Sequence, residues 1–240
     1  MRFLLKRFLE KKGWFLRRIN GLSIGTHLPK DLELLYLNKI KLILDVGAHR
    51  GESVKHFKQL FPCAQIISFE PVRENFEWLK KNIVGDNHYE AICTAFGSKR
   101  GTARIWQRRD STTWSLEGKL NDGNICSDVS QEVEVDTIDN FIESRGIVSV
   151  DLVKLDTEGH EKSVIAGAIE SLKNGVIKAM LVETTLISDN KEHVHIDDIS
   201  NQLLSSGFKL VAIYDQTVWP NPFRMAYCNA LFVKTFEAIH

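Results

Sequence analysis

Apolar and polar positions follow two different periods along most of the chain. Continuous apolar runs, typical of buried strands, occupy residues 41–46, 65–70, 88–96, 150–156 and 177–183. Segments with apolar residues at helical spacing follow at residues 52–61, 73–83, 160–172 and 196–207. This alternation predicts a parallel sheet with helices on both faces.

The last two strands, expected at residues 208–214 and 227–235, have no helical pattern between them. Their connection is too short for a crossover, so we expect them to pair antiparallel. The predicted fold is therefore α/β, with seven principal strands in a mostly parallel sheet and the last strand reversed. No repeat or linker suggests a second domain after residue 41.

The middle of the chain departs from this rhythm. Residues 101–107 and 131–138 alternate like half-exposed strands, and a polar, turn-rich stretch separates them. We expect a hairpin or flap inserted at about residues 101–136 of a domain spanning 41–240. A connection this long is usually functional or disordered. Trp114 within it is a candidate for stacking on a sugar, or part of a surface loop.

Residues 1–40 are predicted to form a helical, basic and amphipathic extension. The first nineteen carry seven Lys or Arg residues and one Glu. Charges at Lys6, Arg7 and Glu10 interrupt the apolar residues, which excludes a secretory signal peptide. Two interpretations stay open: a helix or frayed segment on the domain, or a basic helix lying on a membrane surface through residues 1–19.

Composition narrows the class of partner. Lys plus Arg and Asp plus Glu both number 31, so the net charge gives no reason to expect nucleic acid as a partner. The four cysteines are widely spaced, which favours a reducing cytoplasm over a disulfide framework. No apolar run is long enough to span a membrane. We expect a cytoplasmic protein, with the inner membrane face as an alternative location.

The sequence LILDVGAHRGES, residues 42–53, predicts a ligand-binding turn. Ligands of open α/β sheets lie beyond the carboxyl ends of the strands. Asp45 stands at such an end, Gly47 permits a sharp bend, and Gly51 permits a helix to start close to the strand. Glu70 ends the next strand and could accept hydrogen bonds from both hydroxyls of a ribose. The spacing D-x-G-x-x-x-G lacks the dinucleotide pattern G-x-G-x-x-G, and suits S-adenosylmethionine better.

Four segments together resemble the FkbM family of S-adenosylmethionine-dependent methyltransferases. They are ILDVGAHRGES, ISFEPVRENFEWLKKN, VDTIDNFI and VDLVKLDTEGHEKSVIAGA, within a resemblance running from about Lys41 to Val233. The D-x-E-G-x-E segment at residues 156–161 is the most specific part. The resemblance implies a Rossmann-like class I methyltransferase fold and O-methylation of a sugar, glycan, glycolipid or natural-product hydroxyl. The family often has Asn where this chain has His49.

The predicted cofactor residues lie at the first three strand ends. Asp45 is expected near the methionyl end, bonding its ammonium directly or through water, unless it only caps the turn. Glu70 is expected to bind the ribose. Ala95 and Phe96 should lie near adenine, although Phe96 could equally be a core residue. The turn itself supplies Gly47, Ala48, His49 and Gly51, and whether His49 contacts the methionine tail stays open.

The predicted catalytic residues are Asp156, Glu158, Glu183 and His160. Carboxylates at neighbouring strand ends repel, which raises a pKa unless a cation is present. Asp156 is the preferred base or acceptor-positioning residue. Glu158 either contacts the substrate or caps a helix, Glu183 has a substrate or structural role, and His160 is a base candidate by its ordinary pKa.

The histidines and carboxylates give no clear sign of a metal site. The pair at residues 193 and 195 is expected to be a solvated turn. No metal is assigned, because the carboxylates show no decisive ligand spacing. An NAD-type oxidoreductase and a non-catalytic nucleoside-binding scaffold are the alternative functions, which side-by-side cofactor titrations and tests of methyl transfer separate from a methyltransferase.

Overall fold

The computed structural model describes residues 12, 19–35, 40–83, 85–108, 114–116, 126–190, 192–220 and 223–235. The chain divides into two compact units, Met1–Asn38 and Lys39–His240. The amphipathic helix predicted within residues 1–19 lies outside the described residues, apart from Lys12 and Ile19. The division predicted at residue 40 and the role of the extension stay predictions.

The first unit contains a short capped helix. Its elements are η1 (Ile19–Gly21) and α2 (Leu28–Leu34). The His27 side chain accepts a hydrogen bond from the Lys30 backbone N–H at 3.2 Å, and the Asp31 carboxylate accepts one from Gly25 N–H at 2.8 Å. These bonds fix the start of α2. Among all the helices that the structure describes, none is long and apolar enough to cross a membrane.

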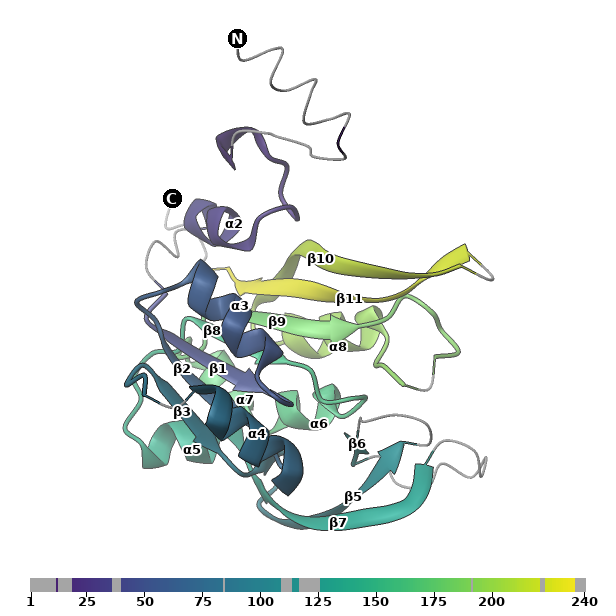
Figure 1. Cartoon of the computed structure of the whole chain (residues 1–240). Coiled ribbons are helices and arrows are strands. Elements are labelled where there is room, and N and C mark those ends of the chain that lie inside the picture. The colour runs from purple at the N-terminus through teal and green to yellow at the C-terminus, as the bar shows by residue number, and fades with distance from the viewer. Residues whose placement is uncertain are drawn as a thin grey trace. The chain divides into compact units, whose positions relative to one another are not determined.

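The second unit is built on a seven-stranded sheet (Figure 1). Its strands are β1 (Leu42–Val46), β2 (Gln65–Phe69), β3 (Tyr89–Ile92), β8 (Leu152–Leu155), β9 (Ala179–Thr184), β10 (Phe208–Pro220) and β11 (Phe223–Lys234). The order is β10-β11-β9-β8-β1-β2-β3, with β11 antiparallel to both of its neighbours and the other pairs parallel. The predicted mostly parallel sheet with a reversed last strand is confirmed.

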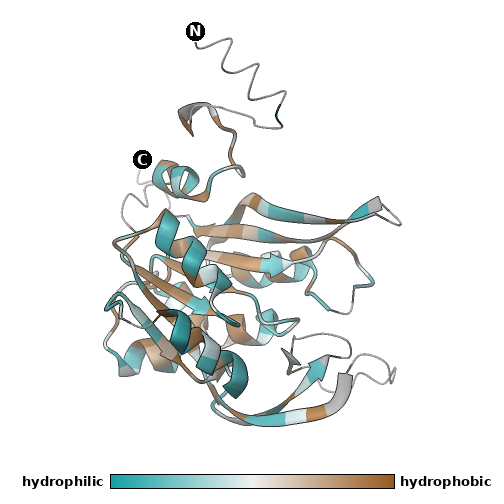
Figure 2. Cartoon of the chain, viewed as in Figure 1, coloured by the Kyte–Doolittle hydropathy of each residue, from teal (hydrophilic) through white to brown (hydrophobic). Residues whose placement is uncertain are grey.

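Helices cover both faces of this sheet, as predicted (Figure 1). One face carries α3 (Glu52–Leu60) and α4 (Arg73–Ile83); the other carries α5 (Ile138–Ser144), α6 (Glu161–Ala166), α7 (Ile169–Lys173) and α8 (Ile196–Leu204). The apolar strands sit between helices whose outer sides are hydrophilic (Figure 2). Because the strands are buried on both sides, they read as apolar runs in the sequence.

A smaller four-stranded sheet adjoins the main one. It contains β4 (Ala95–Phe96), β5 (Gly101–Arg108), β6 (Trp114–Ser115) and β7 (Cys126–Asp136), in the order β4-β7-β5-β6. The single strand predicted over residues 88–96 is wrong, because β3 and β4 belong to different sheets. Ala95 pairs with Val135, and Gly97 N–H donates to Asp136 O at 2.9 Å. The apolar run continues across the gap, so its pattern does not reveal the change of sheet.

The single helix predicted over residues 160–172 is two helices, α6 and α7. A Cβ on Gly167 would lie 2.0 Å from Gly97 O, so the main chain of β4 passes directly against the break. The Asp139 carboxylate accepts hydrogen bonds from the backbone N–H groups of Glu170 and Ser171, at 3.0 and 2.8 Å, and so fixes the start of α7. The break therefore holds α5, α6 and β4 together.

Two hairpins extend on either side of the carboxyl edge of the main sheet (Figure 1). One is formed by β5 and β7 and the other by β10 and β11. Strands β10 and β11 are longer than the ranges 208–214 and 227–235 predicted for them. The added residues 215–220 are mostly polar or half-exposed, which is why they lack a buried-strand pattern.

Candidate active site

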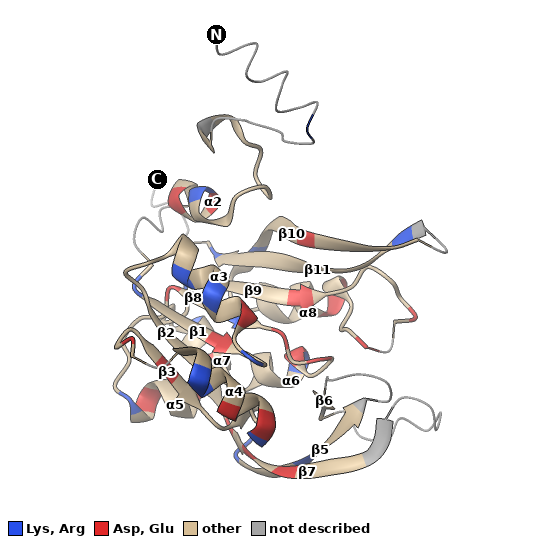
Figure 3. Ribbon diagram, viewed as in Figure 1, with Lys and Arg blue, Asp and Glu red and all other residues tan. Residues whose placement is uncertain are grey.

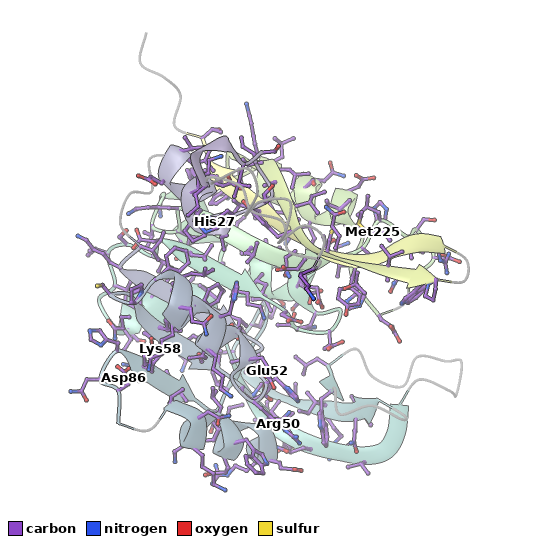
Figure 4. All side chains as sticks on the ribbon, turned by 45° about the horizontal axis from the view of Figure 1, so that its top comes forward. His27, Arg50, Glu52, Lys58, Asp86 and Met225 are labelled. Atoms are coloured by element: carbon purple, nitrogen blue, oxygen red, sulfur yellow. The ribbon has the colours of Figure 1, made fainter. Side chains whose placement is uncertain are left out.

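The turn after β1 is tied to the end of β2 by three backbone N–H groups. Gly47 and Ala48 both donate to Phe69 O at 3.0 Å, and His49 donates to Glu70 Oε2 at 2.9 Å. The turn then leads through Arg50 into α3, which begins at Glu52 (Figure 4). The structure therefore brings Ala48 and His49 next to Glu70, as expected for residues of one binding turn.

Position 47 must be a glycine because the main chain after β8 passes too close to leave room for a side chain. Its φ is +82°, and a Cβ there would lie 1.8 Å from the carbonyl oxygen of Asp156. The sharp bend expected at Gly47 is therefore present, and the closest group to it is the main chain just after β8. Gly51, with φ of +95°, faces Leu79 of α4 at 3.1 Å from its would-be Cβ. Both glycines thus hold the turn close to packed elements.

Glu70 combines burial with two fixed carboxylate oxygens. The residue is 5% exposed, and its Oε1 and Oε2 accept hydrogen bonds from the backbone N–H groups of Val72 and His49, both at 2.9 Å. Burial raises the pKa of Glu70 to about 7. The two backbone hydrogen bonds and one from the Asn75 side chain lower this pKa, but burial has the larger effect. Each oxygen keeps a second lone pair, so the carboxylate can still accept from two adjacent hydroxyls.

The predicted adenine residues form β4. Phe96 is 2% exposed, and its ring centroid lies 4.5 Å from that of Phe69 and 6.0 Å from that of Phe141. Of the two alternatives for Phe96, the structure supports the core residue. Ala95 is also buried. Any reading of adenine at this strand is therefore expected to come from the main chain rather than from the Phe96 ring.

Asp45 lies beneath the turn, at 0% exposure. Its Oδ2 accepts hydrogen bonds from Ser53 Oγ at 2.6 Å and Ser68 Oγ at 3.3 Å. Burial raises the pKa of Asp45, while nearby Lys154 lowers it. With its carboxylate turned toward these groups, we expect Asp45 to support the site through Lys154 rather than by touching the methionyl end directly.

Lys154 is a site residue that the sequence reasoning missed. Its Nζ lies 2.8 Å from Asp156 Oδ2 and 3.9 Å from Asp45 Oδ1. Burial would lower the pKa of Lys154, but the two carboxylates outweigh it and raise the pKa. The protein therefore itself supplies a cation between these strand-end carboxylates. A single Lys two residues before a strand-end Asp, inside an otherwise apolar run, was the available signal.

Replacing Lys154 with methionine should destabilise the fold. It would leave Asp45 and Asp156 buried without their counter-ion, which lowers the free energy of unfolding by roughly 3 kcal/mol. Urea unfolding at pH 7.5 measures this change. The control is Lys162→Met, because Lys162 pairs with Asp198 at 3.4 Å and both side chains are more than half exposed; that loss should stay below about 1 kcal/mol. Equal losses would contradict the buried role of Lys154.

Asp156, Glu183 and His193 come together at the ends of β8 and β9. Glu183 Oε2 lies 3.3 Å from His193 Nδ1, and their side chains are 12% and 9% exposed. Burial and Asp156 together raise the pKa of Glu183 to about 7, although His193 opposes them. Burial would raise the pKa of Asp156 too, but Lys154 outweighs it and lowers the pKa. Asp156 is thus held ionised, whereas Glu183 titrates near neutrality. Acidic residues mark the ends of β1 and β9 in Figure 3.

The prediction that residues 193–195 form a solvated turn is wrong for His193. Thr185 N–H and Thr184 Oγ1 both donate to Val194 O, at 3.0 and 2.6 Å, and draw the segment back onto β9. His195 accepts from Asp197 N–H at 3.3 Å and caps α8. These long-range contacts bury His193 beside Glu183, and no local sequence pattern records them.

Hydrogen bonds to Glu161, the last acidic residue of the D-x-E-G-x-E segment, fix the conformation of this loop. Glu161 Oε1 accepts hydrogen bonds from Thr157 N–H at 2.8 Å and Gly159 N–H at 3.3 Å. Glu158, with φ of +56°, belongs to the loop, and the residue at the N-cap of α6 is His160. The helix-cap alternative for Glu158 is therefore not what the structure shows.

His160 lies at the start of α6, beside the residue that follows β4. Its Nε2 lies 3.5 Å from the position of a Cβ on Gly97, next to β4. The structure therefore groups Asp156 and Glu183 with His193 instead of His160. Within the described part of the chain, no group of three or more His, Cys, Asp or Glu residues could hold a metal ion.

A hollow of about 680 Å³ opens between α4 and the β5–β7 hairpin. Val72, Trp78, Trp114 and Gln131 are among its lining residues. Val72 is also the residue whose N–H binds Glu70. Trp114, the candidate for stacking on a sugar, thus lies on the Glu70 side of the site.

The fold and the site define a class I, S-adenosylmethionine-dependent methyltransferase. The strand order places β1 and its glycine turn at the point where connections leave in opposite directions, with an acid at the end of β2. The Methyltransferase FkbM domain family matches residues 45–210, so the chain belongs to the FkbM methyltransferase family. This confirms the resemblance seen in the sequence and the expected cofactor.

Individual relatives are more distant. The chain is 27% identical over 142 residues to the 2-O-methyltransferase NoeI of Sinorhizobium fredii, a match covering 55% of this chain and 58% of NoeI. It thus spans little more than half of that relative's length. Aeropyrum pernix fibrillarin with bound S-adenosyl-L-methionine is similar with a TM-score of 0.47 and 14% identity, over 90% of this chain and 84% of fibrillarin.

A third similar protein is 1,6-didemethyltoxoflavin-N1-methyltransferase of Burkholderia thailandensis. Its TM-score is 0.47 at 10% identity, over 98% of this chain and 86% of that chain. That structure contains 1,6-didemethyltoxoflavin and S-adenosylhomocysteine. Neither likeness bears on the acceptor of this chain.

Proposed function

We propose that the protein transfers a methyl group from S-adenosylmethionine to a hydroxyl of a sugar or glycan. The observation that carries this proposal is the buried Glu183–His193 pair beside Asp156 at the carboxyl edge of the sheet. A hydroxyl is a weak nucleophile until it begins to lose its proton, and groups that titrate near neutrality are suited to accept that proton. The name of NoeI, a 2-O-methyltransferase, supports the same class of acceptor atom.

Different residues along the edge of the sheet bind the cofactor and position the reacting groups. The cofactor supplies a methyl group on a sulfonium that needs no further activation. Glu70 and the turn at residues 47–49 hold its nucleoside end, and Lys154 keeps Asp156 ionised beside the reacting end. The main task of the chain is then to align the acceptor oxygen and exclude water, which lowers the barrier mainly through positioning.

The proposed function also includes the kind of acceptor, contact with a membrane surface and the location in the cell. The acceptor is a small molecule or glycan and not a nucleic acid, consistent with 31 basic and 31 acidic residues. Residues 1–19 would meet a membrane surface if the acceptor were a glycolipid. A cytoplasmic site of action agrees with the wide spacing of the four cysteines, of which Cys63, Cys93 and Cys228 are free in the described part of the chain.

The proposal is tested by incubating the protein with S-adenosylmethionine and a panel of methyl glycosides of hexoses and deoxyhexoses. The expected result is one O-methyl group on a glycoside hydroxyl, with an equal amount of S-adenosylhomocysteine, detected by mass spectrometry. Transfer to a natural-product phenol or an amine, with no glycoside accepted, would overturn the choice of a sugar. A parallel titration with NAD should show no binding; tight NAD binding would favour the oxidoreductase alternative.

A further inference from the structure

His193 lies in a position that a base for the acceptor would occupy. It belongs to the segment between β9 and α8, on the carboxyl edge where acceptors of this fold class approach. Its Nδ1 faces Glu183 Oε2 at 3.3 Å, and its side chain is 9% exposed. The Tyr227 ring of β11 packs on it with centroids 4.9 Å apart. The imidazole is therefore held on two sides by the protein.

The main chain of His193 is fixed as well. Its backbone N–H donates to Asn190 Oδ1 at 2.9 Å, and the N–H of Glu192 donates to the same oxygen at 2.7 Å. Together with the backbone bond from Thr185 to Val194, these contacts hold the backbone on both sides of His193. A base must be positioned within hydrogen-bond reach of the proton it removes, so this fixed geometry favours a chemical role.

The charged groups around His193 come from three elements. Glu183 belongs to β9, Asp156 follows β8, and Glu158 and Glu161 belong to the loop and start of α6. Burial alone would lower the pKa of His193, but Glu183 first, and then Glu158 and Glu161, raise it above its ordinary value. Tyr227 contributes its ring from β11. Net negative surroundings therefore favour the imidazolium that forms when the imidazole takes up a proton.

We propose that His193 is the catalytic base that removes the proton from the acceptor hydroxyl, with Glu183 as its positioning residue. The Nδ1–H of neutral His193 donates to Glu183, which leaves the lone pair on Nε2. As the acceptor oxygen bonds to the methyl carbon, the carbon–sulfur bond breaks, its electron pair stays on sulfur, and the hydroxyl proton passes to Nε2. This inference rests on the proposed function.

The other predicted bases are less suited to this step. Asp156 is paired with Lys154 at 2.8 Å, so its carboxylate is stabilised in the ionised form and is a weak base. Glu183 is turned toward both Asp156 and His193. His160 lies against Gly97. His193 has its Nδ1 on Glu183, so its second ring nitrogen, Nε2, lies on the other side of the ring from this carboxylate.

The first test needs no acceptor. NMR titration of the histidine ring signals in the S-adenosylhomocysteine-loaded protein should give His193 a pKa above 6.5, the ordinary value for histidine. In Glu183→Gln the pKa of His193 should fall, because the main group raising it is gone. A His193 pKa at or below its ordinary value, unchanged by Glu183→Gln, would overturn the proposed pair whatever the acceptor is.

The second test measures turnover with the methyl glycoside that the panel identifies. His193→Gln should lower kcat at least a hundredfold, the usual contribution of a general base, while S-adenosylhomocysteine affinity stays within twofold. The wild-type rate should rise with pH as His193 loses its proton and then level off. This rise should be absent in His193→Gln and shifted to lower pH in Glu183→Gln.

The matched control is His195→Gln, two residues away in the same segment. Its ring is 29% exposed and caps α8, so kcat should stay within threefold of the wild type. A His193→Gln variant with near-normal kcat and the same rise with pH would refute the base. Failure of the wild type to methylate any glycoside would refute the proposed function, and the NMR titration would still decide whether the pair exists.

Discussion

Replacing Glu70 with alanine is expected to weaken binding of S-adenosylhomocysteine about a thousandfold, because two hydrogen bonds to a charged group, each contributing roughly 1.5–3 kcal/mol, are lost. Glu70 also accepts the N–H groups of His49 and Val72, so the substitution loosens the turn that faces the cofactor. Isothermal titration calorimetry measures the affinity.

The control for this loss is Glu90→Ala. Glu90 lies on β3 and pairs with Arg145 at 2.7 Å, with both side chains more than a third exposed. Its removal should leave the affinity within twofold. A folded Glu70→Ala variant that binds S-adenosylhomocysteine as the wild type does would show that the ribose is not held at β2.

The same assignment predicts how affinity depends on pH. Without ligand, burial raises the pKa of Glu70 to about 7, so near neutrality the carboxyl is partly protonated. Ribose hydroxyls donate to the ionised form, so affinity should rise as pH increases from 6 to 8, with release of a proton. The stability of the fold should change with pH in the opposite direction to the affinity. The folded state binds this proton more tightly than the unfolded chain does, so the contribution of Glu70 to stability decreases as pH rises from about 4.5 to 7.

Replacing Gly47 with alanine is expected to abolish stable folding. The new methyl group would lie 1.8 Å from Asp156 O, a backbone atom directly after β8, whose own N–H is bonded to Val46 O of β1 at 3.1 Å. Separating β1 from β8 would also disturb Lys154 and its two carboxylates. We expect a loss of about 5 kcal/mol or more, in the range typical of severe core substitutions, which is comparable with the whole stability of many domains.

Gly207→Ala separates this clash from backbone strain. The φ of Gly207 is +80°, almost that of Gly47 at +82°, but no atom lies within 4 Å of its would-be Cβ. Left-handed backbone alone should cost roughly 1–2 kcal/mol. Urea unfolding of both variants measures the difference. Equal losses for the two variants would mean that the approach of Asp156 O to the turn is not tight in solution.

The sheet could be predicted from sequence because its strands are buried on both faces. Their apolar runs end abruptly at Asp45, Glu70, Asp156 and Glu183, and parallel strands bring such ends to one edge. This is why the acids at the rim were found without a structure. The change of sheet after Ile92 was not predictable, since Ala95 and Phe96 are as apolar as the strand before them and pair with residues about 40 positions away.

Lys154 and His193 were missed for different physical reasons. Lys154 lies inside an apolar strand, and a single charge in such a run does not by itself indicate a partner. The distances to Asp45 and Asp156 show that it is paired with two carboxylates. His193 stands in a polar segment that looks solvated. Its burial arises from Thr184 and Thr185, which bond to Val194 across the segment, and from the Tyr227 ring of a strand far along the chain.

Cofactor binding as described here requires that the rim formed by β1 and β2 fit an adenosine attached to a charged sulfur. A crystal structure of the protein with S-adenosylhomocysteine tests this most directly. It should show both ribose hydroxyls within hydrogen-bond distance of the Glu70 carboxylate and the sulfur near the ends of β1 and β8. A nucleoside bound elsewhere on the chain, with Glu70 still contacting only protein groups, would contradict the account.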